Sequence, residues 1–359
     1  MNQRFVGIQI LRFVAAMLVV VMHLTQAVSI HITGAGPDKY WAAGSSGVDI
    51  FFVISGFVMA TSTGPSPSTM LARIQLAWTF LKRRFLRIVP LYWFYTLAKA
   101  ALLVVLPGLA SRSSIDPGHL TASLLFIPAV SPWGFVEPTL PVGWTLNFEM
   151  LFYGIFALAI ALGVPRIRFC LLGLMLVFVA GRYFDGVVPL AFYAQAIVFE
   201  FVLGICIAVY FPRFKPWPTP AAWLALGIGL MLMFGISWSS SADRFLTWGC
   251  AAAFLVIGAL WLEPLTAKTR VLSPLSFLGD ASYSIYLSHT FVVPAGVLAL
   301  RKMGFQDMLV IAPVVLLAVV LSGCASYLWI ERPVTRRLKH MLFKTPTPSF
   351  HNREVHHAK

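Results

Sequence analysis

The chain contains little charge for its length. Only 11% of its 359 residues are charged and only 13 are Asp or Glu, whereas 59% are hydrophobic. A soluble domain of this size cannot bury so much apolar surface, so this composition excludes a soluble globular protein. We predict an all-α fold, a polytopic bundle of about ten transmembrane helices in a lipid bilayer.

Cysteine is also scarce, with 4 residues in the chain. All of them lie within apolar segments and at no recurring spacing: Cys170, Cys206, Cys250 and Cys324. This pattern excludes a disulfide framework and a cysteine metal site. We interpret the four as small buried hydrophobic residues, and we predict no metal ion.

The net charge of +14 comes from basic residues in short loops and near the C-terminus. This placement follows the positive-inside rule, so we predict no nucleic-acid partner. With ten spans and both termini in the cytoplasm, 19 of the 27 Lys and Arg residues lie on the cytoplasmic side. An apolar stretch at 120–130 is too short to span, so we interpret it as an interfacial or re-entrant helix.

Ten apolar segments carry the predicted spans. They are residues 5–28, 47–61, 88–106, 143–162, 169–183, 190–211, 221–238, 245–262, 277–298 and 308–330. We predict that 1–333 form one integral-membrane domain. Residues 334–359 are expected to form a basic, disordered cytoplasmic tail.

The first segment contains two ionisable residues, Arg12 and His23. At about 100° per residue, a separation of 11 positions places both on nearly the same helix face, about 16 Å apart along the axis. Such groups normally face a bundle interior or a wet cavity. In the ten-span topology Arg12 lies toward the cytoplasm and His23 toward the outside. The alternative is a signal anchor with a tolerated arginine and a capped histidine.

Later segments place further ionisable residues at defined depths. Asp49, Glu149 and His289 lie in the outer halves of their segments, whereas Arg84 and Arg87 lie at the cytoplasmic mouth of the third. At a spacing of i to i+3, the two arginines share a face and can hold one polyphosphate through charge-assisted hydrogen bonds. We therefore predict an anionic donor bound from inside and acid–base groups near the outer face.

The sequence also leaves other interpretations of these residues open. Asp49 can satisfy free backbone N–H groups at a helix start, and Glu149 can pair with a buried arginine for stability alone. A transporter or flippase of a lipid-linked glycan or small solute also uses intramembrane charges. Against a transporter, the sequence contains no inverted repeat and no matched pair of Gly/Pro-broken helices.

The motifs, in their order and spacing, resemble the acyltransferase-3 family of bacterial integral-membrane acyltransferases. They are Arg12 with His23, then residues 47–57, 84–92, 144–149, 278–289 and 331–333. The resemblance is to stand-alone members without an appended extracytoplasmic domain. Such members typically O-acylate sugars of exopolysaccharide, lipopolysaccharide or other glycoconjugates.

The resemblance implies an acyl-CoA-dependent O-acetyltransferase of the bacterial cytoplasmic (inner) membrane, with acetyl-CoA as the donor and a carbohydrate, free or lipid-linked, as the acceptor. The implied donor-binding residues are Arg12, Arg84 and Arg87. The implied catalytic residues are His23, Asp49 and Glu149. Further candidates for substrate or oxyanion contacts are Trp144, Tyr153, Ser282 and His289.

The expected mechanism uses His23 as a general base, oriented by Asp49 or Glu149, toward an acceptor hydroxyl from the outer face. A route through an acyl-enzyme intermediate is equally open. The identity of the acceptor, the acyl chain and the oligomeric state, including a homo-oligomer, stay open as well.

Overall fold

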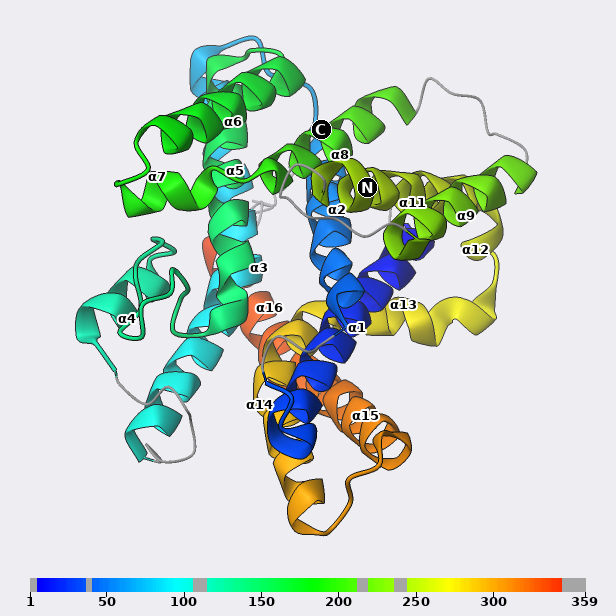
Figure 1. Ribbon diagram of the computed structural model, residues 1–359. Coiled ribbons are helices and arrows are strands. Elements are labelled where there is room, and N and C mark those ends of the chain that lie inside the picture. The colour runs from blue at the N-terminus through cyan, green and yellow to red at the C-terminus, as the bar shows by residue number, and fades with distance from the viewer. Residues whose placement is uncertain (1–4, 37–40, 106–114, 212–218, 236–243, 344–359) are drawn as a thin grey trace, which may run out of the picture.

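The computed structural model describes residues 5–36, 41–105, 115–211, 219–235 and 244–343 (Figure 1). Within these ranges the regular structure is helical, apart from one isolated antiparallel bridge between Val130 and Val136. The predicted all-α fold class is confirmed.

Six helical stretches are long and apolar enough to cross a membrane, so the chain is a multi-pass membrane protein. Their principal helices are α1 (Val6–Val28), α2 (Ser46–Ser62), α3 (Met70–Val105), α5 (Trp144–Leu162), α14 (Ser282–Lys302) and α15 (Met308–Ser326). Shorter apolar stretches contain α8 (Glu200–Tyr210), α9 (Thr219–Gly235) and α11 (Cys250–Trp261). The total of about ten spans stays a prediction.

The remaining α-helices are shorter or more polar. They are α4 (Pro117–Leu124), α6 (Arg166–Tyr183), α7 (Val188–Tyr193), α12 (Glu263–Thr266), α13 (Ser273–Asp280) and α16 (Arg332–Leu342). Helix α4 occupies the start of the stretch expected as an interfacial or re-entrant helix. Its N-terminus is capped by the carboxylate of Asp116, which accepts a hydrogen bond from the backbone N–H of His119.

Several helix boundaries differ from the prediction. The predicted segment 190–211 is divided among α7, a short 3-10 turn and α8, and 277–298 crosses the break between α13 and α14. Helix α3 begins at Met70 and not near residue 88, so the basic cluster lies inside a helix of 36 residues, about 54 Å long. No Gly or Pro interrupts the chain between Met70 and Val89, and most residues there favour a helix. The expected disordered tail at 334–359 is helical up to Leu342, and 344–359 lie outside the described residues.

Helix α1 lies at the centre of the bundle (Figure 1). It contacts α2, α13 and α14, and also α11 and α15. The approach of α2 to α1 is close, because a Cβ atom at Gly47 would overlap the carbonyl oxygen of Ala15. A Cβ at Gly279 of α13 would overlap the carbonyl oxygen of Gln9 in the same way. Both helices therefore need glycine where they touch α1.

An aromatic cluster holds α2, α5 and α8 together. The ring of Phe201 stacks on Phe52 at 4.6 Å between centroids and on Phe152 at 4.4 Å. All three side chains are buried. Such contacts add to the apolar burial that stabilises helix packing, and they hold α5 against α2 and α8, while α5 also packs along α3.

Candidate active site

A small cavity of about 230 Å³ lies between α1, α2, α3, α5 and α14. Four of the five helices contribute ionisable side chains to its wall. These are Arg12, Arg84, Arg87, Glu149, Tyr153, Tyr283 and Tyr286. The structure thus brings together five of the ten residues that the sequence singled out as candidates.

Glu149 lies in this cavity with the arginines, so the predicted separation of carboxylates and arginines by depth is wrong for Glu149. The physical reason is the length of α3, whose early start places Arg84 and Arg87 well inside the helix and beside α5. The carboxylate of Glu149 accepts a hydrogen bond of 2.6 Å from the hydroxyl of Tyr153, one helical turn further along α5.

The three arginines keep hydrogen-bond donors for a ligand. Arg12 Nη1 donates to the Gln9 side chain at 3.2 Å, and Arg84 Nη2 donates to Ser62 Oγ at 2.6 Å. No carboxylate of the described residues lies within 4.0 Å of their guanidinium nitrogens. Arg84 Nε is buried and has no hydrogen-bond partner in the described part of the chain. A buried guanidinium group that has an unpaired N–H donor and no carboxylate beside it is suited to bind an anionic ligand.

The two candidate histidines form a pair beside this cavity. The rings of His23 and His289 lie 5.0 Å apart between centroids, with an interplanar angle of 32°. Tyr286 links the pair to the cavity, because its ring lines the cavity and lies 5.8 Å from that of His289. His289 is fully buried, and neither of its ring nitrogens has a hydrogen-bond partner among the described residues.

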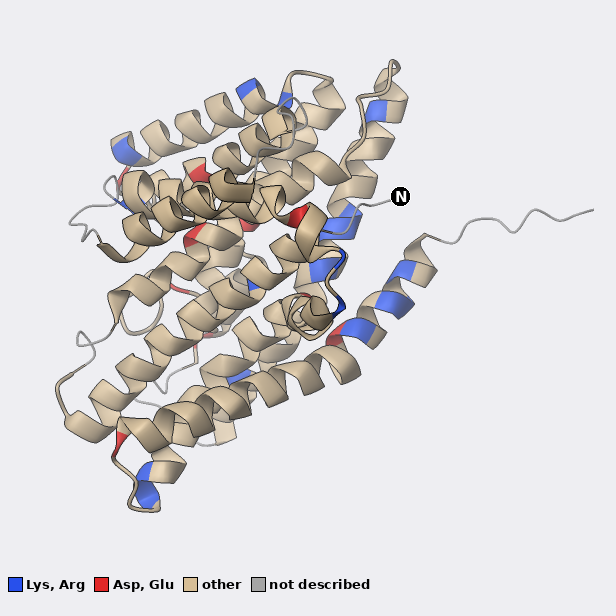
Figure 2. Ribbon diagram, turned by 90° about the vertical axis from the view of Figure 1, so that its right-hand side faces the viewer, with Lys and Arg blue, Asp and Glu red and all other residues tan. Residues whose placement is uncertain are grey.

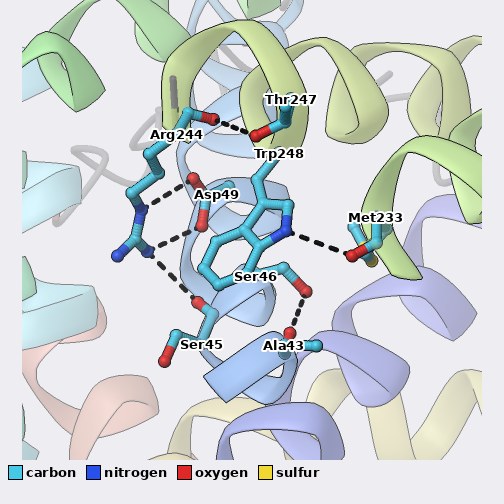
Figure 3. Close-up of polar contacts among 8 residues, drawn as sticks. All are labelled: Ala43, Ser45, Ser46, Asp49, Met233, Arg244, Thr247 and Trp248. Carbon is cyan, nitrogen blue, oxygen red and sulfur yellow. Dashed lines mark hydrogen bonds and ion pairs between the residues drawn. The ribbon is translucent and has the colours of Figure 1, made fainter. Parts of the chain in front are cut away.

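Asp49 pairs with Arg244, as Figure 3 shows. Asp49 Oδ2 lies 2.7 Å from Nη2 of Arg244, and Oδ1 accepts a bond of 3.1 Å from Nε. The guanidinium group of Arg244 also donates a hydrogen bond of 3.3 Å to the carbonyl oxygen of Ser45 and lies over the ring of Trp248. Both carboxylate oxygens of Asp49 thus bond to Arg244, and the orientation of His23 by Asp49 stays a prediction.

Glu149, the other carboxylate expected to orient His23, is hydrogen-bonded to Tyr153. Two further candidates lie apart from the arginine cavity. Trp144 lines a separate cavity of about 640 Å³ together with Arg244. Ser282 is fully buried at the start of α14, and its hydroxyl has no hydrogen-bond partner within the described ranges.

Sequence reasoning missed two charged residues of this region. Arg244 stands just before an apolar segment, and nothing local shows that it pairs with Asp49, 195 positions earlier. Glu200 is a fully buried carboxylate on α8 within electrostatic reach of both residues. Its position inside the apolar segment 190–211 was a usable signal, because carboxylates within membrane segments are usually functional or paired.

A larger cleft of about 970 Å³ adjoins the arginine cavity. The two spaces share Val58, Arg84 and Arg87 in their walls. The cleft lies between α3 and α16, and Figure 2 shows basic segments along this last helix facing basic segments of the bundle. We call it the basic cleft. Among the residues that the structure describes, no group of three or more His, Cys, Asp or Glu could hold a metal ion.

The fold and the site define a multi-pass helical membrane protein with an arginine-rich cavity inside the bundle. A family model described as an acyltransferase domain (acyltransferase 3) matches residues 5–328, so the chain belongs to the acyltransferase-3 family.

The chain is also similar to two rhizobial proteins. It is 38% identical over 309 residues to the exopolysaccharide production protein ExoZ of Rhizobium meliloti (strain 1021), covering 83% of this chain and 92% of that protein. It is 32% identical over 138 residues to protein 2 in the picA locus of Rhizobium radiobacter, covering 35% and 66%. No solved structure matches the chain.

Proposed function

We propose that the chain is a membrane O-acyltransferase that moves an acyl group, in the first instance acetyl, from acyl-CoA to a carbohydrate hydroxyl. The acceptor would be an extracytoplasmic or lipid-linked sugar, such as a precursor of exopolysaccharide. Family membership and the similarity to an exopolysaccharide production protein support this proposal. The observation that carries it is the arginine cavity, which adjoins a wide basic cleft through Arg84 and Arg87.

In this proposal acyl-CoA enters the basic cleft from the cytoplasm. Arg84 and Arg87 hold its diphosphate at the junction of the two spaces, because forked guanidinium groups match phosphate oxygens. The thioester then lies in the smaller cavity, where Arg12 and Tyr153 line the wall.

The chemical step transfers the acyl carbon from sulfur to oxygen. His23 takes the proton of the acceptor hydroxyl, the oxygen attacks the thioester carbonyl, and the C–S bond breaks. The proton held by His23 then neutralises the departing thiolate. The hydroxyl of Tyr153, which donates to Glu149 in this structure, is the proposed donor to the developing oxyanion, and it has to exchange the bond to Glu149 for one to the oxyanion. His289 packs against His23 and limits the orientations of its ring.

The residues outside the arginine cavity take other proposed roles. Asp49, bonded to Arg244, stabilises the start of α2 beside α1. Trp144 and Arg244 line the separate cavity, which is the proposed approach of the acceptor. Trp144 directly precedes Thr145, which lines the arginine cavity, so the first turn of α5 borders both spaces. A role for Ser282 stays a prediction.

Thiol release from acetyl-CoA by the protein in nanodiscs tests this proposal. The acceptor is surface polysaccharide from producing cells, freed of esters by mild alkali. Wild-type protein is expected to release CoA thiol and to restore O-acetyl groups, measured by mass spectrometry. A transporter without acyl transfer would do neither.

The variant His23→Ala is expected to lose about 100- to 10,000-fold in rate, the typical contribution of a general base. His340→Ala is the matched control, because this exposed histidine of α16 lies outside the His23–His289 pair and does not line the basic cleft. Wild-type O-acetylation by His23→Ala would refute the assignment.

A further inference from the structure

The basic cleft contains more positive charge than binding one diphosphate requires. Its wall holds six basic side chains and two carboxylates. The basic residues are Arg83, Arg84 and Arg87 on α3 with Arg332, Arg336 and Lys339 on α16, and the acidic ones are Asp280 and Glu331. One of the carboxylates, Glu331, already accepts a hydrogen bond of 2.7 Å from Ser284 Oγ. The excess of four positive charges faces a space large enough for a nucleotide.

The cations of α16 form one row along the cleft. Arg332, Arg336 and Lys339 follow at spacings of four and three residues, so they share a helix face and extend over about 10 Å. Helix α16 packs against α3, and the guanidinium of Arg83 lies 5.6 Å from the ring centre of Phe343 at the end of α16. Arg337 also belongs to α16 but does not line the cleft. The row therefore faces α3 across the cleft.

The arginines of α3 and the cations of α16 differ in which of the two spaces they line. Arg84 and Arg87 line both the arginine cavity and the cleft, whereas the α16 cations line the cleft alone. A donor whose diphosphate lies at Arg84 and Arg87 places its adenosine end in the cleft. That end of CoA carries a second phosphate, on the 3′ oxygen of the ribose. Diphosphate and 3′-phosphate together carry about four negative charges near neutral pH, which matches the excess in the cleft.

We propose that Arg336 and Lys339 bind the 3′-phosphate of CoA, so that the enzyme selects CoA thioesters over donors that lack this phosphate. This inference rests on the proposed acyl-CoA donor. Helix α16 lies beyond residue 328, where the family match ends, so the selection would depend on a part of the chain outside that match.

Equilibrium binding tests the proposal without an acceptor. Calorimetry measures the Kd of CoA and of 3′-dephospho-CoA for the full chain in phosphatidylcholine nanodiscs at a fixed salt concentration. Wild-type protein is expected to bind CoA about 10- to 100-fold more tightly, the value of one or two charge-assisted contacts. The double variant Arg336→Gln/Lys339→Gln is expected to bind both ligands within about threefold of each other.

Arg337→Gln is the matched control, because it removes the same charge from α16 but not from the cleft wall. It is expected to keep the wild-type Kd ratio, which separates local contacts from the general field of a basic helix. Each single variant, Arg336→Gln and Lys339→Gln, is expected to lower the ratio in part. Size-exclusion chromatography checks that every variant is folded.

The outcomes are distinguishable from failure of the proposed function. If neither CoA nor 3′-dephospho-CoA binds wild-type protein, the acyl-CoA donor itself is wrong. Equal affinities for the two ligands would overturn only the 3′-phosphate site, as would an unchanged ratio in the double variant. A further arm uses discs with phosphatidylglycerol. Loss of the CoA preference in those discs would assign the α16 cations to lipid phosphate and refute the proposal.

Discussion

Removing Arg244 is expected to destabilise the protein strongly. The variant Arg244→Leu leaves the carboxylate of Asp49 inside the bundle without its guanidinium partner, near the buried carboxylate of Glu200. Asp49 is fully buried, with 0% of its side chain exposed. An uncompensated buried charge costs about 3–5 kcal/mol in the free energy of unfolding.

The reverse change is expected to cost less. In Asp49→Asn the Arg244 side chain, which is 16% exposed, can regain solvent contacts for part of its guanidinium. Asparagine also keeps an acceptor for one of the two bonds, so we expect a loss of about 1–2 kcal/mol. The double variant Asp49→Asn/Arg244→Leu is expected to lose less stability than the two single losses added together, by about 1–3 kcal/mol.

A thiol-reactive fluorescent dye measures this stability in detergent. The free thiol of Cys170 is buried in the folded protein, so its labelling reports unfolding. At about 2 °C per kcal/mol, Arg244→Leu is expected to lower the Tm by about 6–10 °C. The matched control is Arg182→Leu on α6, an exposed arginine over the ring of Phe178, with an expected loss below about 1 kcal/mol. A wild-type Tm for Arg244→Leu, or strict additivity in the double variant, would refute the reasoning.

Two further changes test the packing and the cavity. Gly47→Ala is expected to lower stability by about 1–3 kcal/mol, because the new methyl group overlaps the carbonyl oxygen of Ala15. Gly154→Ala is the control, because a Cβ atom there has nothing within 4 Å. Equal Tm values for the two variants would contradict this view of the α1–α2 contact. Tyr153→Phe is expected to lower kcat about 10- to 100-fold with the donor KM nearly unchanged, measured by thiol release. A change confined to KM would show that Tyr153 binds the donor and does not stabilise the transition state.

Hydrophobic segments and motif spacing predicted much of this fold. The predicted segment 5–28 corresponds to α1 and 143–162 to α5, each within one residue of the helix ends. The start of α3 was wrong by 18 residues, because four basic residues between 82 and 87 were interpreted as a loop at the membrane surface. A helix can carry such residues when neighbouring helices provide a polar cavity, and this requires knowledge of the tertiary contacts.

The candidate site was predictable in part. The motif arginines Arg12, Arg84 and Arg87 do line one cavity, as a shared anionic ligand would require. The depth of Glu149 was not predictable, because counting along separate segments assumes that each crosses a bilayer of about 30 Å once. Helix α3 is about 54 Å long and violates that assumption.

The pairing of Asp49 with Arg244 could not be inferred at all. The two residues are separated by 195 positions, and Arg244 stands outside every motif that the sequence analysis used. Each residue, taken alone, has the pattern of an ordinary charged residue near the end of a helix. The pair forms only because α2 and the start of the 245–262 segment pack together.

The central position of α1 has a consequence for biosynthesis. Of the described helices, α1 leaves the ribosome first, yet two of its main partners come late in the chain, since α13 ends at Asp280 and α14 at Lys302. At about 5–20 residues per second, translation from Val28 to Lys302 takes roughly 14–55 s. During this interval Arg12 lies in a helix whose packing is incomplete, so the insertion machinery has to shield that charge from lipid until the C-terminal third arrives.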